Sequence, residues 1–423
     1  MAAPDLTAPT AAPATVVRAV LALGLTQIIG WGTSFYALGV LAGPIESGTG
    51  WSGPAIFAGA TLALFAAGLI STAVGRAIDV YGARRIMAIG SIAQGLALAV
   101  VATAETLTHY LVGWTLVGLA MRLTLYDAAF AGLVQIDPVN GRRSIAYLTL
   151  LGGFASTVFW PVGYLLAEVT DWQTTFWIYA ALNIFICAPL HFAGLPSWSG
   201  RAQVQPETPG AALPSAEPQA QARDMPLDGR ARTQAMLLFS IVMAAYSFNF
   251  GVGGVHLVRI IEAAGVTAAI AVALGAYKGV AQVIGRVWEL VYGRKLAALN
   301  LGRVSIALLP ISFVPLLFAH GGLETAVIFA TVYGISNGLM TIVRGAVPLA
   351  LFGARDYGTV LGILATPALI CNALAPVVFA WFVDAYGYRA GTWLLLGVGV
   401  AGWIAMEGLK VWHDRRRPAA STA

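Results

Sequence analysis

Three charged residues lie inside long apolar stretches of the sequence, where a charge is costly. Lys278, Arg122 and Asp127 are each flanked by enough apolar residues to place them deep in a membrane. A charge at the centre of a bilayer costs about 2.5–3.5 kcal/mol on insertion scales, and such residues commonly hold ions or relay protons. We therefore expect Lys278 and Arg122 to bind the negative charge of a small substrate. Asp127 is the candidate for proton coupling.

The same three residues also have a structural interpretation. Arg122 can pair with Asp127 or with an acid of a neighbouring helix, and Lys278 can neutralise a buried acid. Tyr126 follows Arg122 at four residues and shares its helix face, and Gln282 stands in the same relation to Lys278. Asp127 comes five residues after Arg122 and is expected to point elsewhere. The sequence does not choose between a substrate and Asp127 as the partner of the two cations.

Polar and aromatic side chains recur at helical spacing in three other apolar stretches. Such groups either line a polar cavity or join packed helices through hydrogen bonds. With the two cations and their neighbours they form the predicted substrate-binding set, which comprises Lys278, Arg122, Gln27, Trp31, Ser34, Tyr126, Tyr246, Asn249, Gln282, Asn337 and Thr341. Arg344 lies near a helix end, where a gate or an anchor is expected. His256 lies near the opposite end and is expected to be an interface histidine.

These residues are positioned by apolar segments that have the length of a membrane crossing. Apolar residues make up 58% of the 423 residues and charged residues 10%, against about a quarter in a soluble domain. Because about 20 apolar residues span the hydrocarbon core, the sequence accommodates about twelve crossings. Inside lipid the backbone must satisfy its own hydrogen bonds, and the alternation of a membrane barrel is missing, so helices are expected.

A polar segment divides the predicted crossings into two groups of six. Residues 195–233 are rich in Pro, Ala, Gln and Gly and are predicted to form a linker. We therefore expect an all-α membrane protein with two pseudo-symmetric six-helix bundles. Its predicted parts are an N-terminal tail (1–17), an N-terminal bundle (18–194), the linker (195–233), a C-terminal bundle (234–411) and a basic C-terminal tail (412–423).

The net charge of +5 indicates membrane topology rather than a nucleic-acid partner. Basic residues fall in short loops at alternate helix ends, which predicts a bacterial inner-membrane protein with both termini in the cytoplasm. Cys187 and Cys371 both lie in predicted crossings, which argues against a disulfide framework and a thiolate metal site. No cofactor, metal cluster or catalytic constellation is expected, so we do not expect an enzyme. The expected partners are a small-molecule substrate, a coupling ion and membrane lipid, and the chain is expected to act as a monomer.

A charged, glycine-containing loop occurs twice, about 210 residues apart. The sequence GRAIDVYGARR (75–85) returns in altered form as GRVWELVYGRK (285–295), and two later segments repeat at nearly the same offset. Matches in the same order indicate a duplicated six-helix unit. Within the first loop, Asp79 can accept hydrogen bonds from a neighbouring helix N-terminus or from Arg84 or Arg85.

The loop, the two groups of six helices and the central linker together resemble the major facilitator superfamily. The first copy matches the loop signature of that superfamily, and the second keeps it in part. The resemblance implies a conformational latch, closed in one alternating-access state and broken in the other; a loop that only packs and sets topology is the alternative. The residues of the implied latch are Gly75, Asp79, Gly82, Arg84, Arg85, Gly285, Glu289, Gly293 and Arg294.

Within the superfamily, the chain is most similar to the monocarboxylate and oxalate–formate antiporter-like branch. Residues 36–52 and 256–265 resemble helix junctions of that branch, and Lys278 lies where it carries a cation that pairs with a carboxylate. The branch usually has a second cation in helix 11, whereas residues 358–383 have none. The resemblance implies a proton-coupled symporter or antiporter of a small organic anion such as a monocarboxylate. A proton-coupled efflux pump for drugs and a non-transporting receptor are the alternatives.

Overall fold

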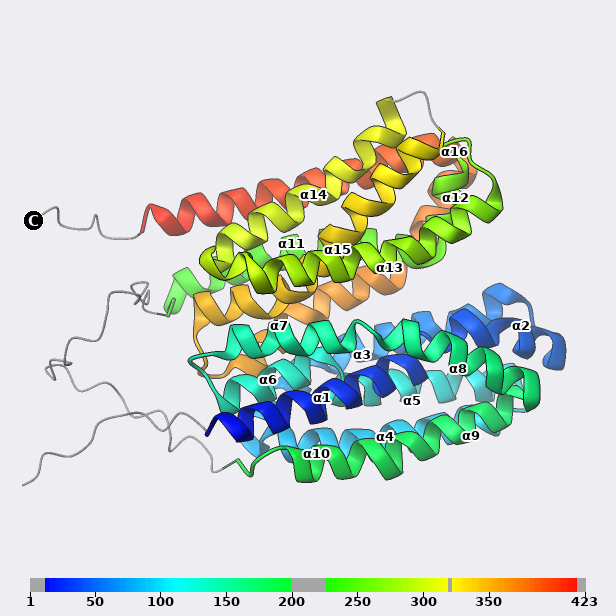
Figure 1. The fold of residues 1–423 in the computed structure, drawn as a ribbon, viewed down its shortest axis with the longest axis horizontal. Coiled ribbons are helices and arrows are strands. Elements are labelled where there is room, and N and C mark those ends of the chain that lie inside the picture. Colours follow the sequence, from blue (N-terminus) through cyan, green and yellow to red (C-terminus); the bar gives the residue numbers. More distant parts are fainter. Residues whose placement is uncertain (1–11, 199–225, 319–321, 417–423) are drawn as a thin grey trace, which may run out of the picture.

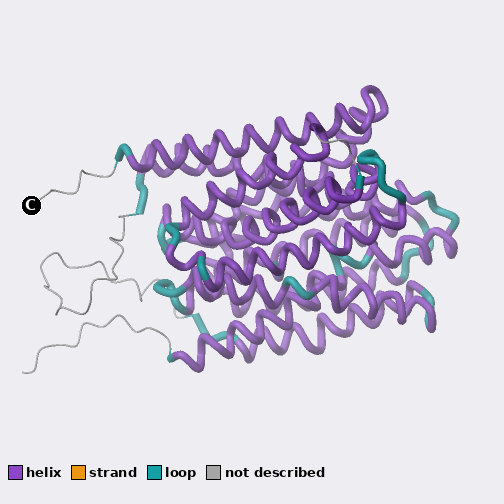
Figure 2. The backbone as a smooth tube through the Cα atoms, turned by 45° about the horizontal axis from the view of Figure 1, so that its top comes forward, coloured by secondary structure: helices purple, strands orange, loops and turns teal. Residues whose placement is uncertain are grey.

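The computed structural model describes residues 12–198, 226–318 and 322–416. Almost all of these residues are helical, and the helices form two bundles that lie side by side (Figure 1). Short loops join successive helices (Figure 2). Most of the predicted N-terminal tail, most of the predicted linker and the end of the predicted C-terminal tail lie outside the described residues.

The first bundle occupies the lower half of Figure 1. Its helices are α1 (Pro13–Thr33), α2 (Leu38–Thr49), α3 (Gly53–Tyr81), α4 (Ala83–Ala102), α5 (Leu107–Thr124), α6 (Tyr126–Ile136), α7 (Gly141–Gly152), α8 (Ala155–Val169), α9 (Trp172–Leu182) and α10 (Ala188–Gly194). A π-helical turn over Asn183–Cys187 joins α9 to α10 in one crossing.

The second bundle occupies the upper half of Figure 1. Its helices are α11 (Gly229–Val255), α12 (Leu257–Glu262), α13 (Ala268–Val291), α14 (Ala298–Phe318), α15 (Leu323–Phe352) and α16 (Tyr357–Asp414). A 3-10 turn over Gly293–Lys295 follows α13.

The last helix, α16, contains two membrane crossings. Its 58 residues would make about 87 Å of helix, nearly three times the hydrocarbon thickness of a bilayer. Gly387 interrupts it with non-helical angles (φ 79°, ψ 166°), a conformation that favours glycine. The described residues contain eleven helical stretches long and apolar enough to cross a membrane. Because α16 holds two crossings, the predicted all-α fold of twelve crossings is confirmed.

Three helices extend beyond their predicted bounds. α1 begins at Pro13 rather than at residue 18, α11 begins at Gly229 rather than at residue 234, and α16 ends at Asp414 rather than at residue 411. Proline suits the first helical turn, where its missing N–H has no helical partner. The apolar pattern marks only the hydrocarbon core, while intrahelical hydrogen bonds continue a helix past it. Residues 229–233, predicted as linker, therefore belong to α11.

Several crossings are broken near their middle. The first changes direction over residues 34–37, between α1 and α2, and the fourth breaks at Leu125, which has extended angles (φ −83°, ψ −168°) between α5 and α6. A buried break leaves backbone groups without helical partners, and these need other partners. The side chain of Gln27 provides one, because its Nε2 donates to the carbonyl oxygen of Thr124 at 2.8 Å.

The two bundles meet through glycines at the end of the molecule that holds Pro13 and Asp414, here called the terminal end (left in Figure 1). A Cβ atom on Gly75 of α3 would lie 2.1 Å from the carbonyl oxygen of Gly358 in α16. Only glycine at this position allows such a close approach of the two backbones. The bundles are therefore in direct backbone contact at the terminal end.

Candidate functional site

A first inter-bundle contact, here called the first lock, joins Asp79 to the start of α16. The carboxylate of Asp79, near the end of α3, accepts hydrogen bonds from the backbone N–H of Gly358 (2.9 Å), the backbone N–H of Thr359 (2.7 Å) and the hydroxyl of Thr359 (2.6 Å). The first N–H groups of a helix lack helical acceptors and attract negative charge. The acceptor for this helix end thus comes from the opposite bundle.

The other residues of the first loop do not reach Asp79. Gly82 has a φ of 83°, which favours glycine, and Arg85 is exposed. The guanidinium carbon of Arg84 lies 4.2 Å from the ring centre of Phe192. Of the two partners that the sequence allowed for Asp79, the structure contains the helix N-terminus and not the arginines.

A second inter-bundle contact, here called the second lock, is built differently. Glu289 of α13, in the second copy of the loop, pairs with Arg142 of α7 at 2.9 Å. The same guanidinium donates to the carbonyl oxygens of Gly293 (3.0 Å) and Leu296 (2.6 Å). Glu289 and Asp79 therefore both act between the bundles, but Glu289 uses an arginine that the sequence did not single out.

The glycines of the second copy serve their own bundle. A Cβ atom on Gly285 would lie 2.9 Å from the carbonyl oxygen of Ile335, so this glycine packs α13 against α15. Gly293 begins the 3-10 turn that presents its carbonyl oxygen to Arg142. The side chain of Arg294 lies outside what the structure describes.

We expect Asp79→Asn to open the terminal end, because it removes the charge that holds three donors. Hydrogen bonds to charged groups contribute about 1.5–3 kcal/mol, so an opening at least about tenfold more frequent is expected. The rate of thiol labelling at a cysteine introduced by Ser71→Cys measures this opening, in a chain from which Cys187 and Cys371 have been removed. Ser71 is a suitable reporter because it is fully buried in α3 and its carbonyl packs on Gly362 of α16.

The matched control for that measurement is Asp384→Asn, which removes an exposed acid outside both locks. Its labelling rate should equal that of the unmodified background. An unchanged labelling rate in the Asp79 variant would contradict a locking role.

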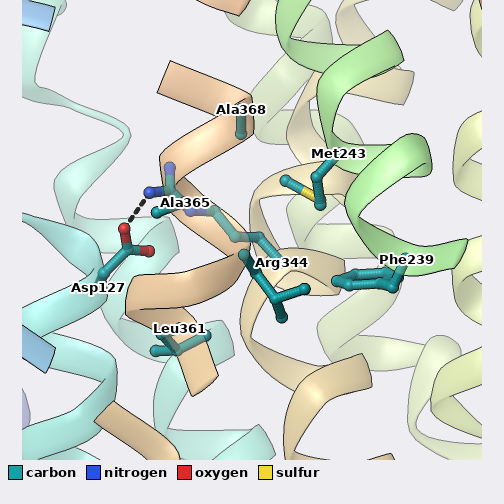
Figure 3. A pocket seen from close by; sticks show the side chains of 8 residues that line it. Asp127, Phe239, Met243, Arg344, Leu361, Ala365 and Ala368 are labelled. Carbon is teal, nitrogen blue, oxygen red and sulfur yellow. Dashed lines mark hydrogen bonds and ion pairs between the residues drawn. The ribbon is translucent and has the colours of Figure 1, made fainter. Parts of the chain in front are cut away.

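Asp127 lies at the centre of a buried three-residue charge cluster. Its carboxylate pairs with Arg122 of α5 and with Arg344 of α15 in the opposite bundle, and the latter contact is visible in Figure 3. The side chains of Asp127 and Arg122 are 1% and 6% exposed. The cluster holds two positive charges and one negative charge, so both cations depend on a single carboxylate.

The expectation that Asp127 points away from Arg122 is wrong. That expectation assumed one helix, whereas extended angles at Leu125 end α5 and begin α6 in a new direction. The structure also shows that Arg344, predicted as a gate or an anchor, binds across the bundles. Arg122 therefore already has an acidic partner in this state, and we remove it from the candidate anion site.

Apolar side chains surround the cross-bundle pair. A small pocket beside Asp127 and Arg344 is otherwise lined by Phe239, Met243, Leu361, Leu364, Ala365 and Ala368, all of which are drawn in Figure 3. Charges interact more strongly in such surroundings than in water, and an unpaired one is correspondingly costly.

Arg286, which the sequence did not single out, is buried without an acidic partner in the described chain. It is 6% exposed, and its Nη2 donates to the hydroxyl of Thr341 at 3.4 Å. Its Nε and Nη1 have no hydrogen-bond partner in the part of the chain that the structure describes. A Cβ atom on Gly153 would lie only 1.9 Å from Nη1, so the guanidinium crosses to the end of α7 in the opposite bundle.

The sequence contained a signal for Arg286 in its spacing. Lys278, Gln282 and Arg286 follow one another at four-residue intervals and therefore share one face of α13. Arg286 is the second residue of the repeated loop, and the equivalent Arg76 of the first copy is exposed. The motif did not predict that Arg286 is buried, because equivalent positions of the two loop copies have different surroundings in the two bundles.

Lys278 is the second cation inside the helix bundles that has no acidic partner among the described residues. Its side chain is half-buried, and Nζ lies 5.9 Å from the ring centre of Tyr333. Nearby helices carry buried amides with unused polar atoms: both side-chain polar atoms of Asn337 and the Oδ1 of Asn249. These groups, with Gln282, remain candidates for a polar substrate.

Two of the predicted binding residues are engaged within the first bundle instead. Gln27 donates to Thr124 and accepts from the indole N–H of Trp31 at 3.2 Å, and it has no exposed surface. Ser34 is equally buried and donates to the carbonyl oxygen of Gly30 at 2.5 Å. We therefore leave Gln27 and Ser34 out of the candidate site, because their hydrogen-bonding capacity supports the broken helices.

Comparison with solved structures identifies the fold. The structure of the human organic anion transporter MFSD10 matches with a TM-score of 0.73, covering 92% of this chain and 99% of that one at 16% identity. The major facilitator superfamily transporter FucP in its outward conformation matches with a TM-score of 0.67, covering 93% and 99% at 14% identity. At such identities the likeness concerns the fold, and the chain has the major facilitator fold.

Sequence comparison is less extensive. No family model matches the chain. The multidrug resistance protein B homologs of two strains of Mycobacterium tuberculosis are each 30% identical over 95 residues, which is 22% of this chain and 17% of each relative. The match thus spans less than a fifth of the relatives' length. The structural similarities support the major facilitator fold, but none of the comparisons supports the monocarboxylate branch in particular.

Proposed function

We propose that this protein is a secondary transporter of small organic anions that works by alternating access of its two bundles. The observation that carries the proposal is Arg286, a buried guanidinium with two unused nitrogens and, among the described residues, no acid beside it. A buried charge is stable only when it is paired. A carboxylate is the natural partner, because guanidinium geometry suits two parallel hydrogen bonds to its oxygens.

The electrostatics of the centre favour an anionic cargo. Asp127, Asp79 and Glu289, the acids placed at the interface between the bundles, are all engaged by partners of the opposite bundle. Arg286 and Lys278 have no acidic partner in the described chain. A cationic substrate would meet two uncompensated positive charges, whereas an anion would neutralise them.

Alternating access follows from the position of the locks. Both join the bundles at the terminal end, so this end is closed in the present state. For the bundles to rock about a central site, the first and second locks must break and re-form. We propose that the terminal end faces the cytoplasm of a bacterial cell, that the protein lies in the inner membrane, and that one chain is sufficient for transport.

Asp127 is the proposed coupling residue. Protonating its carboxylate would leave Arg344 without a counter-charge and weaken the bond between the bundles. Binding a proton at Asp127 would thereby favour the state in which the bundles separate at this level. This links the proton gradient to the conformational change without contact between proton and substrate.

A second candidate is proton-coupled efflux of toxic compounds. The 95-residue match to the multidrug resistance protein B homologs favours it. Export and import use the same central site, so the two candidates differ in direction. The unpaired cations favour anionic compounds as the exported cargo.

Reconstitution into liposomes tests the proposal. We expect uptake of radiolabelled monocarboxylates that a pH gradient stimulates, and no gradient-driven movement of cationic dyes. Movement of dyes without carboxylates would contradict the anion proposal and favour drug efflux. Carboxylate binding without movement would contradict transport and favour a receptor.

A further inference from the structure

A cluster of aromatic rings, here called the aromatic cluster, crosses between the bundles. Its members are Trp31, Phe35, Tyr36 and Tyr126 of the first bundle and Tyr246 and Phe250 of the second. The ring of Phe35 stacks on that of Phe250 across the interface, with centres 6.0 Å apart and planes at 24°. Each ring thus touches another, from Tyr36 in the broken first crossing to Tyr246 in α11.

The breaks in the helices bring these rings together. Phe35 and Tyr36 lie in the turn between α1 and α2, and their rings meet edge to face at 5.3 Å. Tyr126 directly follows the break at Leu125, and its ring lies 5.2 Å from that of Trp31. Trp31, Phe35 and Tyr36 retain partial exposure. The cluster therefore presents accessible ring surface rather than a fully packed core.

Arg286 lies beside this cluster. Its guanidinium and the Tyr126 hydroxyl both lie against the end of α7, at neighbouring residues. Adjacent glycines of α7 fix the arrangement: a Cβ atom on Gly152 would lie 2.5 Å from the Tyr126 hydroxyl, and one on Gly153 would strike Arg286. A cation with unused donors and a set of aromatic rings therefore occupy one place between the bundles.

We propose that the anion held by Arg286 is an aromatic monocarboxylate, whose ring lies among the rings of the aromatic cluster. This rests on the proposed function and specifies its substrate class. The carboxylate takes the unused guanidinium donors, and the ring replaces the contact between Phe35 and Phe250. When the bundles separate at this level, an aromatic guest offers each side the stacking partner it has lost.

The geometry favours a single carboxylate over two. Lys278 lies eight residues from Arg286 on the same helix face, which is about 12 Å along the axis. This spacing favours one carboxylate at Arg286 over a small dicarboxylate that bridges both cations. A short aliphatic acid could neutralise Arg286, but would leave the ring surfaces without a matching partner.

Binding to the purified full-length protein and uptake into liposomes test this inference. The probes are benzoate and phenylacetate, compared with cyclohexanecarboxylate, which has similar size and charge without an aromatic ring, and with acetate. We expect both aromatic acids to bind at least about tenfold more tightly than cyclohexanecarboxylate. Phe250→Leu and Phe35→Leu should each remove most of that preference, because they weaken the binding of the aromatic acids more than that of cyclohexanecarboxylate.

The matched control is Phe185→Leu, at a phenylalanine that is 74% exposed and far from the cluster in sequence, which should keep the full preference. Equal binding and uptake of benzoate and cyclohexanecarboxylate would overturn the aromatic inference and leave the anion proposal standing. If none of the four acids bound, the anion proposal itself would fall.

Discussion

Arg286→Gln is expected to lower carboxylate uptake by about a hundredfold or more without destabilising the protein. Hydrogen bonds to a charged group contribute about 1.5–3 kcal/mol each, so losing two corresponds to at least that factor. The thermal stability of the protein, in contrast, should not decrease. Arg286 is buried without an acidic partner in the described chain, so a neutral side chain removes an unfavourable charge. The melting temperature without substrate should stay constant or rise.

This combination of signs separates a binding role from a structural one. A guanidinium that only supported packing would lower the melting temperature when removed. Uptake is measured in liposomes and unfolding in detergent, with Arg76→Gln as control, because Arg76 holds the same register in the first loop and is exposed. Carboxylate uptake within about threefold of the original would remove Arg286 from the site.

Gly153→Ala probes the same position without changing charge. Its Cβ would displace chiefly the end of a flexible side chain, the Nη1 of Arg286, and would lie 3.1 Å from the carbonyl oxygen of Leu150, which needs only a small backbone shift. Uptake of all carboxylates should fall together, because the cation moves while the rings remain.

Asp127→Asn is expected to be the most destabilising of the proposed substitutions. It leaves Arg122 and Arg344 buried or partly buried with no shared counter-charge, and breaking a buried pair typically costs about 3–5 kcal/mol. Arg122→Gln should be milder, because the pair between Asp127 and Arg344 remains balanced. Thermal unfolding measures both, and the double variant Asp127→Asn/Arg122→Gln should recover part of the lost stability.

Uptake by the Asp127 variants tests the coupling role. With asparagine in place of Asp127, a pH gradient should no longer stimulate any remaining carboxylate uptake. For the thermal unfolding measurements the control is Glu407→Gln. The ion pair of Glu407 with Arg303 is partly exposed, and such pairs contribute at most about 1 kcal/mol. Retained stimulation by the gradient would show that another group carries the proton.

The fold was accessible from sequence because its signals are local. The length of apolar runs measures a membrane crossing, and the repeated loop reveals the duplication without any knowledge of contacts. The locations of Asp79 and Glu289 followed from the same loop. The predicted helix ends were less accurate, because the apolar pattern stops at the edge of the hydrocarbon core while α1 and α11 extend beyond it.

The candidate site was predicted only in part, because charge pairing depends on residues that are distant along the chain. Asp127 and Arg344 are 217 residues apart and meet across two bundles. A single extended residue, Leu125, breaks the helix and turns Asp127 back to Arg122. Helical periodicity in the sequence does not predict such a break.

Composition and spacing determined that this chain is a duplicated bundle of membrane helices with rare buried charges. They could not determine which cations are paired, since neither the apolar stretch around Arg122 nor the charged loop that holds Arg286 reveals a partner distant along the chain. The tertiary structure assigns an acid to Arg122 and none to Arg286 within the described residues. Whether a buried charge is neutralised is a property of its neighbours in space, and the proposed cargo follows from that pairing.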